Sequence, residues 1–197
     1  MVMVDQLVVV VRDRLESLLQ NTRQNAENWV AITNPVEMDG TPSEGLANKV
    51  ILSLVSLQTD PVSSPFVAPQ PGAGHMYPVS APRLVLDAYL LIAPNFAGSH
   101  YLGGLAMLSE IISYLQEMPV LSAAEIPELP DDCPRVAVEF VSLDFAQANN
   151  LMMIIGIKCF PFLLYRLRRL PFEGPAISAV AHPVRAATPE ARPRVPQ

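Results

Sequence analysis

Apolar residues recur at helical spacing near the start of the chain. Over residues 3–24 they follow the i, i+3, i+4, i+7 spacing that marks one face of an α-helix. Arg12, Asp13 and Glu16 lie among the residues of the opposite face. The pattern predicts an amphipathic helix that packs on its own sheet, with an interface helix as the alternative. The apolar positions are Val4, Leu7, Val8, Val11, Leu15, Leu18 and Leu19.

Short apolar or alternating stretches predict β-strands at residues 29–33, 50–57, 84–92, 135–143 and 162–170. The stretch 50–57 is apolar at successive positions, which predicts a central strand covered on both faces. The last stretch alternates apolar residues with arginines, so we expect it to bury one face and to present charge on the other.

A further helix is predicted over residues 99–117, between Ser99 as its cap and Pro119 as its stop. Gly103 and Gly104 lie inside this pattern and should permit close packing rather than bind a phosphate, because no phosphate-loop context surrounds them. The residues expected on the inward face are Leu102, Leu105, Leu108, Ile112 and Leu115.

Asp144 and Gln147 have the spacing of a capping box, in which each side chain bonds the other residue's backbone. They predict a helix that runs to about Ile155 and stops at Gly156.

The order of elements is therefore αβββαβαβ. It predicts an α+β fold, with one mixed sheet of four to five strands and helices packed on it. The helix between the strands at 84–92 and 135–143 favours a crossover connection. Residues 59–82 hold many prolines and are expected to form a long loop or arm without regular structure. We expect a domain at residues 1–173 and a flexible Pro/Ala/Arg-rich tail at 174–197.

The composition is unusually apolar for a domain of 197 residues. Half of the residues are hydrophobic, 16% are charged and the mean hydropathy is +0.28. Burial of apolar surface against partner proteins explains this balance. A membrane span is disfavoured, because the longest apolar segment, residues 151–165, contains Lys158 and Pro161.

The first residues, Met1–Val11, also lack the features of a signal peptide: Asp5 and Gln6 interrupt the run and no basic region precedes it. We therefore expect no membrane insertion, and a protein that is made and kept in the cytoplasm or leaves it within a larger particle.

Charge and metal-binding residues offer little chemistry. The formal net charge of −6 argues against nucleic acid as a partner. The three histidines and two cysteines match no zinc spacing, so no metal and no cofactor is expected. Free buried thiols are expected at Cys133 and Cys159. The acidic loop with Glu125, Glu128, Asp131 and Asp132 lacks calcium-loop spacing and should be solvated.

The densest basic cluster is Arg166, Arg168 and Arg169. One interpretation is a docking stripe for an acidic partner. The other is a solvated edge strand that its charges protect from aggregation. The tail contributes three more candidate contacts with a partner, Arg185, Arg192 and Arg194.

Five segments, taken in order, carry a resemblance to a known family. They are residues 48–55 (NKVILSLV), 86–96 (LDAYLLIAPNF), 101–117 (YLGGLAMLSEIISYLQE), 138–151 (VEFVSLDFAQANNL) and 156–166 (GIKCFPFLLYR). Together they resemble the tail-terminator, or cap, proteins of contractile injection systems, over roughly residues 3–173. The chain departs from the family where Met152 replaces a frequent Trp. The loop 59–82 and the tail have no counterpart.

The resemblance implies a protein that is not an enzyme. It implies a homohexameric ring on the last layer of inner tube and sheath, opposite the baseplate, that ends polymerisation. The inner tube and sheath proteins are the implied partners. Two alternatives stay open: a baseplate or adaptor subunit of the same particle, and a small enzyme that uses Cys159 or His100.

Overall fold

The computed structural model describes residues 4–37, 39–60, 84–124, 126–129, 135–157 and 161–172, together with the backbone of 77–79 and 179–181. The chain divides into two compact units. The larger comprises Met1–Ser63 with Leu84–Phe172, and the smaller comprises Ser64–Arg83 with Glu173–Gln197. Each unit is described by itself. Cys133, Cys159 and the arginines of the tail lie outside the described residues.

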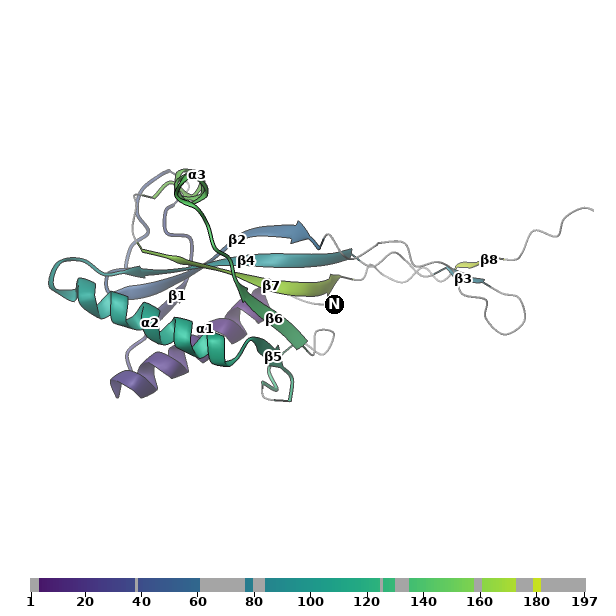
Figure 1. The fold of residues 1–197 in the computed structure, drawn as a ribbon, viewed down its shortest axis with the longest axis horizontal. Helices are drawn as coiled ribbons and strands as arrows, with labels where there is room; N and C mark the ends of the chain where they lie inside the picture. The colour runs from purple at the N-terminus through teal and green to yellow at the C-terminus, as the bar shows by residue number, and fades with distance from the viewer. Residues whose placement is uncertain are drawn as a thin grey trace, which may run out of the picture. The chain divides into compact units, whose positions relative to one another are not determined.

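The larger unit is built on a six-stranded mixed sheet in the order β1-β2-β4-β7-β6-β5 (Figure 1). β1 pairs with β2 in parallel, and every other neighbouring pair is antiparallel. The strands are β1 (Val30–Ile32), β2 (Lys49–Thr59), β4 (Leu84–Asn95), β5 (Val120–Ser122), β6 (Arg135–Phe140) and β7 (Leu163–Phe172).

Three helices cover the two faces of this sheet. α1 (Val4–Arg23) and α2 (Tyr101–Glu117) lie on one face, and α3 (Phe145–Ile155) lies on the other (Figure 1). α2 carries the chain from β4 across the sheet to β5 and β6, so that β4 and β6 run parallel with β7 between them. The predicted α+β fold, its mixed sheet and its crossover are confirmed.

The alternation of side chains along β4 explains why this strand is almost continuously apolar. Ala88, Leu90 and Ile92 belong to the main core, under α1 and α2. Leu91 and Ala93 point to the other face and form a smaller core with Met152 of α3. Successive residues of a strand face opposite sides of a sheet, so a strand covered on both sides needs apolar residues at both parities.

The helix predicted over residues 3–24 and the helix predicted to start at Asp144 are confirmed as α1 and α3. α1 buries the stripe around Leu7, Leu15 and Leu19, which settles its role as a core helix. α3 begins with a complete capping box, in which Asp144 accepts from the Gln147 N–H and Gln147 accepts from the Asp144 N–H. It ends at Gly156, whose φ of 81° is the left-handed conformation that glycine adopts without strain.

The inward face predicted for α2 is wrong at several positions. A short 3₁₀ turn, Gly98–His100, precedes the helix, so Ser99 lies inside that turn and does not cap α2. The buried residues are Gly104, Met107, Leu108, Ile111 and Leu115, whereas Leu102 and Ile112 are exposed. The buried face of α2 differs from the predicted one because Gly104, and not Leu105, packs against the core. A Cβ added to Gly104 would lie 2.9 Å from Phe96.

Two expectations about strands also need correction. The sheet has six strands rather than four to five, because the three-residue β5 is too short to give a periodic signal. β2 is flanked on both sides only at Val50–Leu52, where β1 pairs with it. Leu54 and Leu57 are exposed, so the second half of β2 is not the covered central strand that its apolar sequence predicted.

The smaller unit contains a two-stranded antiparallel ribbon of β3 (Tyr77–Val79) and β8 (Ala179–Ala181). The expectation that residues 59–82 hold no regular structure is therefore wrong at 77–79. Pro78 is compatible with this strand because proline is tolerated where a strand lies at an edge. The remainder of the predicted tail lies outside the described residues.

Candidate functional site

All three clustered arginines lie on β7, between β4 and β6. Tyr165 and Leu167 point into the core beneath α1 and α2, so the intervening Arg166 points to the opposite face. α3 covers that face near Leu91 and Ala93, and the arginines lie farther along the strands, around Asp87. The interpretation of a charge-protected edge strand is wrong, because β7 has a paired strand on each side.

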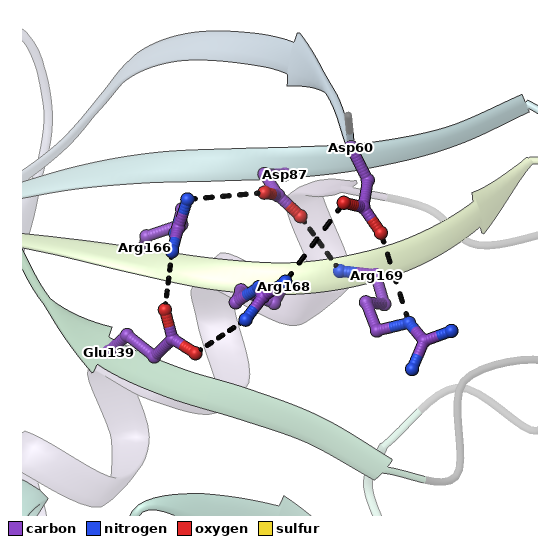
Figure 2. A network of polar contacts seen from close by, with 6 residues as sticks. All are labelled: Asp60, Asp87, Glu139, Arg166, Arg168 and Arg169. Carbon is purple, nitrogen blue, oxygen red and sulfur yellow. Dashed lines mark hydrogen bonds and ion pairs between the residues drawn. The ribbon is translucent and has the colours of Figure 1, made fainter. Parts of the chain in front are cut away.

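Glu139 of β6 joins two of these arginines (Figure 2). Arg166 Nη2 donates to Glu139 Oε2 at 2.5 Å, and Arg168 Nη1 donates to Glu139 Oε1 at 2.8 Å. Both carboxylate oxygens are therefore engaged by a guanidinium, the strongest kind of protein hydrogen bond. The arrangement bridges β6 to β7 on the face that carries no helix at this point.

Two buried aspartates complete the network. The side chains of Asp60 and Asp87 are only 1% and 2% exposed. Arg166 Nη1 lies 3.8 Å from Asp87 Oδ2, and Arg168 Nη2 lies 4.0 Å from Asp60 Oδ1. A buried carboxylate is costly unless cations or donors surround it, so the nearby arginines offset the cost of burying these two aspartates in the sheet.

Asp87 also holds an irregularity in β7. The register runs from Leu86↔Leu170 to Ala88↔Leu167, so Arg168 and Arg169 both stand opposite Asp87. Arg169 takes a φ of 62°, which is unfavourable for a residue with a side chain. Its backbone N–H donates to Asp87 Oδ1 at 3.0 Å. The carboxylate thus stabilises a β-bulge that turns Arg169 away from the path of Arg168.

The network lowers the pKa of Glu139, because Arg168 and then Arg166 donate hydrogen bonds to its ionised form. The same bonds raise the pKa of both guanidinium groups. Three carboxylates and three guanidinium groups therefore lie against one another in this network. The group contains no nucleophile, and its donors and acceptors are largely directed at one another, which suits a structural role.

Arg169 differs from the other two arginines in its exposure. Its side chain is 70% exposed, against 29% for Arg166 and 27% for Arg168. Its Nε lies 3.9 Å from Asp60 Oδ2, and Figure 2 shows the terminal nitrogens pointing away from the network. Of the cluster predicted from the sequence, Arg169 is the residue best placed to meet an acidic partner.

Asp60, Asp87 and Glu139 were not identified from the sequence. A signal existed for Asp87, which interrupts the apolar run Leu84–Ile92 and so required a partner inside the sheet. No comparable signal marks Glu139, because its pairing with β7 depends on a register set by distant contacts.

Large apolar side chains are exposed on α3. Phe145 and Ile154 are 96% and 82% exposed, and Met153 of the same helix is 71% exposed. Only Met152 of this helix is buried. These exposed apolar side chains belong to neither core cluster, and exposed apolar surface of this kind is typical of a site that a neighbouring protein covers.

Within the described residues, no three His, Cys, Asp or Glu side chains come together as a metal site. None of the helices in that part of the chain combines the length and apolarity needed to cross a bilayer.

Residues 8–186 match the sequence model of the family described as the Pvc16 N-terminal domain. The chain belongs to this family. The match spans both the sheet with its arginine–carboxylate network and the β3–β8 ribbon. The resemblance to tail-terminator proteins noted in the sequence is thereby confirmed. A search of curated proteins gave no match.

Solved structures share the fold, among them the following two proteins. The first is the sheath/tube terminator of the extracellular contractile injection system PVC in its extended state, with a TM-score of 0.53 and 14% identity over 95% of this chain. The second is the tube-terminating cap of the anti-feeding prophage, with a TM-score of 0.55 and 13% identity over 97% of this chain. The match covers 64% of the first protein and 62% of the second, so this chain corresponds to part of each.

Proposed function

We propose that this chain is a structural cap subunit of a contractile injection particle, where it ends the inner tube and sheath opposite the baseplate. The observation that carries the proposal is the family match over residues 8–186. The shared fold with two proteins named as terminators supports it. The mechanism is surface complementarity: one face fits the growing end, and the other offers nothing to which a further layer can add.

The proposed arrangement is a ring of six copies in contact with the inner tube and sheath proteins. A closed ring needs two different contact surfaces on each copy. Exposed apolar residues on opposite faces of the sheet suit this requirement, with Leu102 on α2 and Phe145 and Ile154 on α3 (Figure 1). Such a subunit turns over no substrate, is assembled in the cytoplasm and reaches other places only within the particle.

Arg169, together with Arg185, Arg192 and Arg194 of the tail, is proposed to contact acidic partner surfaces. Arg169→Gln should weaken incorporation of the subunit into particles, because a guanidinium that is 70% exposed can pair with an incoming carboxylate. The matched control is Arg135→Gln, which removes an exposed arginine at the start of β6. Equal incorporation of both variants, measured by quantitative immunoblot of purified particles, would remove Arg169 from the interface.

The function is tested by deleting the gene from a producing strain and imaging the particles by electron microscopy. The expected result is a loss of the terminal ring and a broad distribution of tube and sheath lengths, both restored by the unaltered chain. Particles of normal length with an intact end would overturn the proposal. Gold-labelled protein found at the baseplate end would replace it with the baseplate or adaptor alternative.

A further inference from the structure

β2 has an open backbone edge along its second half. Thr33 N–H donates to the Leu52 carbonyl at 3.2 Å, and the chain then leaves the sheet at Asn34 and Pro35. From Leu54 to Thr59, the described residues provide β2 with a partner strand on the β4 side alone. The outward N–H and C=O groups of this stretch are thus available to a further strand, in the position that β1 would occupy if it continued.

This edge lacks the usual protection against strand addition. Natural edge strands carry lysine, proline or inward charges that prevent pairing with other chains. Leu54–Thr59 reads Leu-Val-Ser-Leu-Gln-Thr and contains none of these residues. Its one protective feature is the irregularity between Leu54 and Ser56. An uncharged edge with exposed Leu54 and Leu57 is suited to pairing with a strand from another chain.

A hollow of about 480 Å³ lies beside the start of this edge. Its walls include Val4, Val8 and Val9 of α1, with Ile32 and Leu54 from the sheet. Asp5 is the one charged residue among those that line it. The site therefore suits an uncharged extended segment whose side chains alternate between the hollow and solvent, and a charged strand would lose hydration there without gaining a partner.

The opposite edge of the sheet offers less backbone. β5 has only three residues, and the Ser122 carbonyl at its end accepts a hydrogen bond from the Ile126 N–H at 2.8 Å. Very short edge strands discourage strand addition, so the second half of β2 is the longer open edge among the described residues.

The β3–β8 ribbon supplies a strand with matching properties. An isolated two-stranded ribbon is marginally stable in water and requires a larger sheet to support it. Both strands are uncharged, Tyr77-Pro78-Val79 and Ala179-Val180-Ala181. Pro78 removes one backbone donor from β3, whereas β8 keeps a donor at every residue. β8 is thus the better strand for a new pairing.

We infer that β8 of one copy adds to the Leu54–Thr59 edge of β2 in the next copy. The inference rests on the proposed function, because it supplies the contact that holds the cap ring together. The two surfaces are different, so each copy donates one strand and receives one. Contacts of this kind continue beyond a pair, and they close into a ring when the rotation from one copy to the next returns to the first.

The test places a cysteine on each side of the contact in the full chain. Cys133→Ser and Cys159→Ser remove the native thiols, and Leu57→Cys and Val180→Cys introduce the probes. Mild oxidation should give a ladder of covalent dimers and larger species on a denaturing gel without reductant. A cross-linked monomer would show that each ribbon binds its own sheet, and no cross-link would show that the strands do not meet; either result overturns the inference.

A matched control replaces Leu57→Cys by Ile112→Cys, which puts the thiol on α2 at a residue that is as exposed as Leu57. This variant should lose the ladder. A second measurement needs no cross-link: Leu57→Lys should abolish the higher masses seen by light scattering, whereas Ile112→Lys should keep them. If the masses of Leu57→Lys were the same as those of the unaltered chain, the inference would be overturned, whatever the control variant did.

The outcome is separable from that of the deletion experiment. Loss of length control in particles without the chain, combined with no ladder, would refute the strand exchange and leave the cap function standing. A ladder combined with normal particles would leave the strand exchange standing and refute the cap function.

Discussion

Gly104 is the residue at which α2 comes closest to the segment that follows β4. A Cβ built on it would lie 2.9–3.0 Å from Cβ, Cγ and Cδ2 of Phe96, whereas a Cβ on Gly103 meets nothing within 4 Å. Phe96 Cβ is fixed to the backbone and cannot swing away. Gly104→Ala should therefore lower the free energy of unfolding by about 1–3 kcal/mol through overpacking.

Gly103→Ala is the matched control in the same turn of α2. It should be neutral or stabilise by up to about 1 kcal/mol, because alanine favours the helix and the space is open. Urea unfolding of both variants measures the difference. Equal stabilities would mean that Phe96 moves aside and that the close approach does not constrain the fold.

Glu139 makes stability depend on pH in a direction that its partners determine. Arg168 and Arg166 hold its pKa below the ordinary value, so its contribution is fully present above the unfolded pKa of about 4.3 and is lost as the pH falls through the folded pKa. Solvent screens the pairs, because the side chain is 38% exposed. Glu139→Gln should cost about 1 kcal/mol or less at pH 7.

That cost should shrink as the pH falls through the lowered pKa of the folded chain, because the carboxyl of the unaltered chain then takes up a proton. Glu44→Gln, in the exposed loop before β2, is the control and should change stability little at either pH. A cost for Glu139→Gln that stays the same at low pH would show that the carboxylate charge is not what the network uses.

At the scale of elements, α2 offers neighbouring isoleucines with opposite environments. Ile111 is fully buried and Ile112 is exposed. Ile111→Asp places an unpaired charge in the main core and should cost several kcal/mol, more than about 3 kcal/mol by the usual cost of such changes. Ile112→Asp should cost less than about 1 kcal/mol. Thermal and urea unfolding compare them, and similar losses for both would contradict the face assigned here.

The elements that the sequence predicted well are those with local chemical signals. The capping box of Asp144 and Gln147 and the stop at Gly156 depend on residues within one turn, so they could be recognised without tertiary information. The long strands β4 and β7 could also be predicted. A strand buried on both faces is apolar at successive positions, and a strand buried on one face alternates apolar and polar residues.

What the sequence could not predict depends on tertiary contacts. The face of α2 was displaced because Phe96 packs over Gly104, and a glycine carries no hydrophobic signal. The partners of Arg166 and Arg168 come from β6, β4 and the end of β2, which a register set by the whole sheet brings together. From the sequence, at most one member of the network can be predicted. This is Asp87, a charged residue within an apolar run that needs a partner.

At the scale of the whole molecule, the buried core formed by the described residues lies within the larger unit. Its members run from Leu7 to Leu170, and the partly buried residues packed against it end at Phe172. The described part of the smaller unit is a ribbon of two three-residue strands. The chain thus separates a region that folds by burying apolar side chains from a region whose strands can gain most from pairing with another sheet.

Ending the chain at Phe172 should therefore leave a cooperative fold. The free energy of unfolding should change by about 1 kcal/mol or less, because the sequence after Phe172 is rich in Pro, Ala and Arg and has no apolar stripe to add to a core. The same truncation removes β8, so the Leu57→Cys variant of the shortened chain should form no ladder with itself, while it should still accept Val180→Cys from a full-length chain. Calorimetry and the cross-linking gel measure the two effects separately.

A broad, non-cooperative transition would show that the residues after Phe172 take part in folding the core. The division between the folding region and the pairing region would then be wrong.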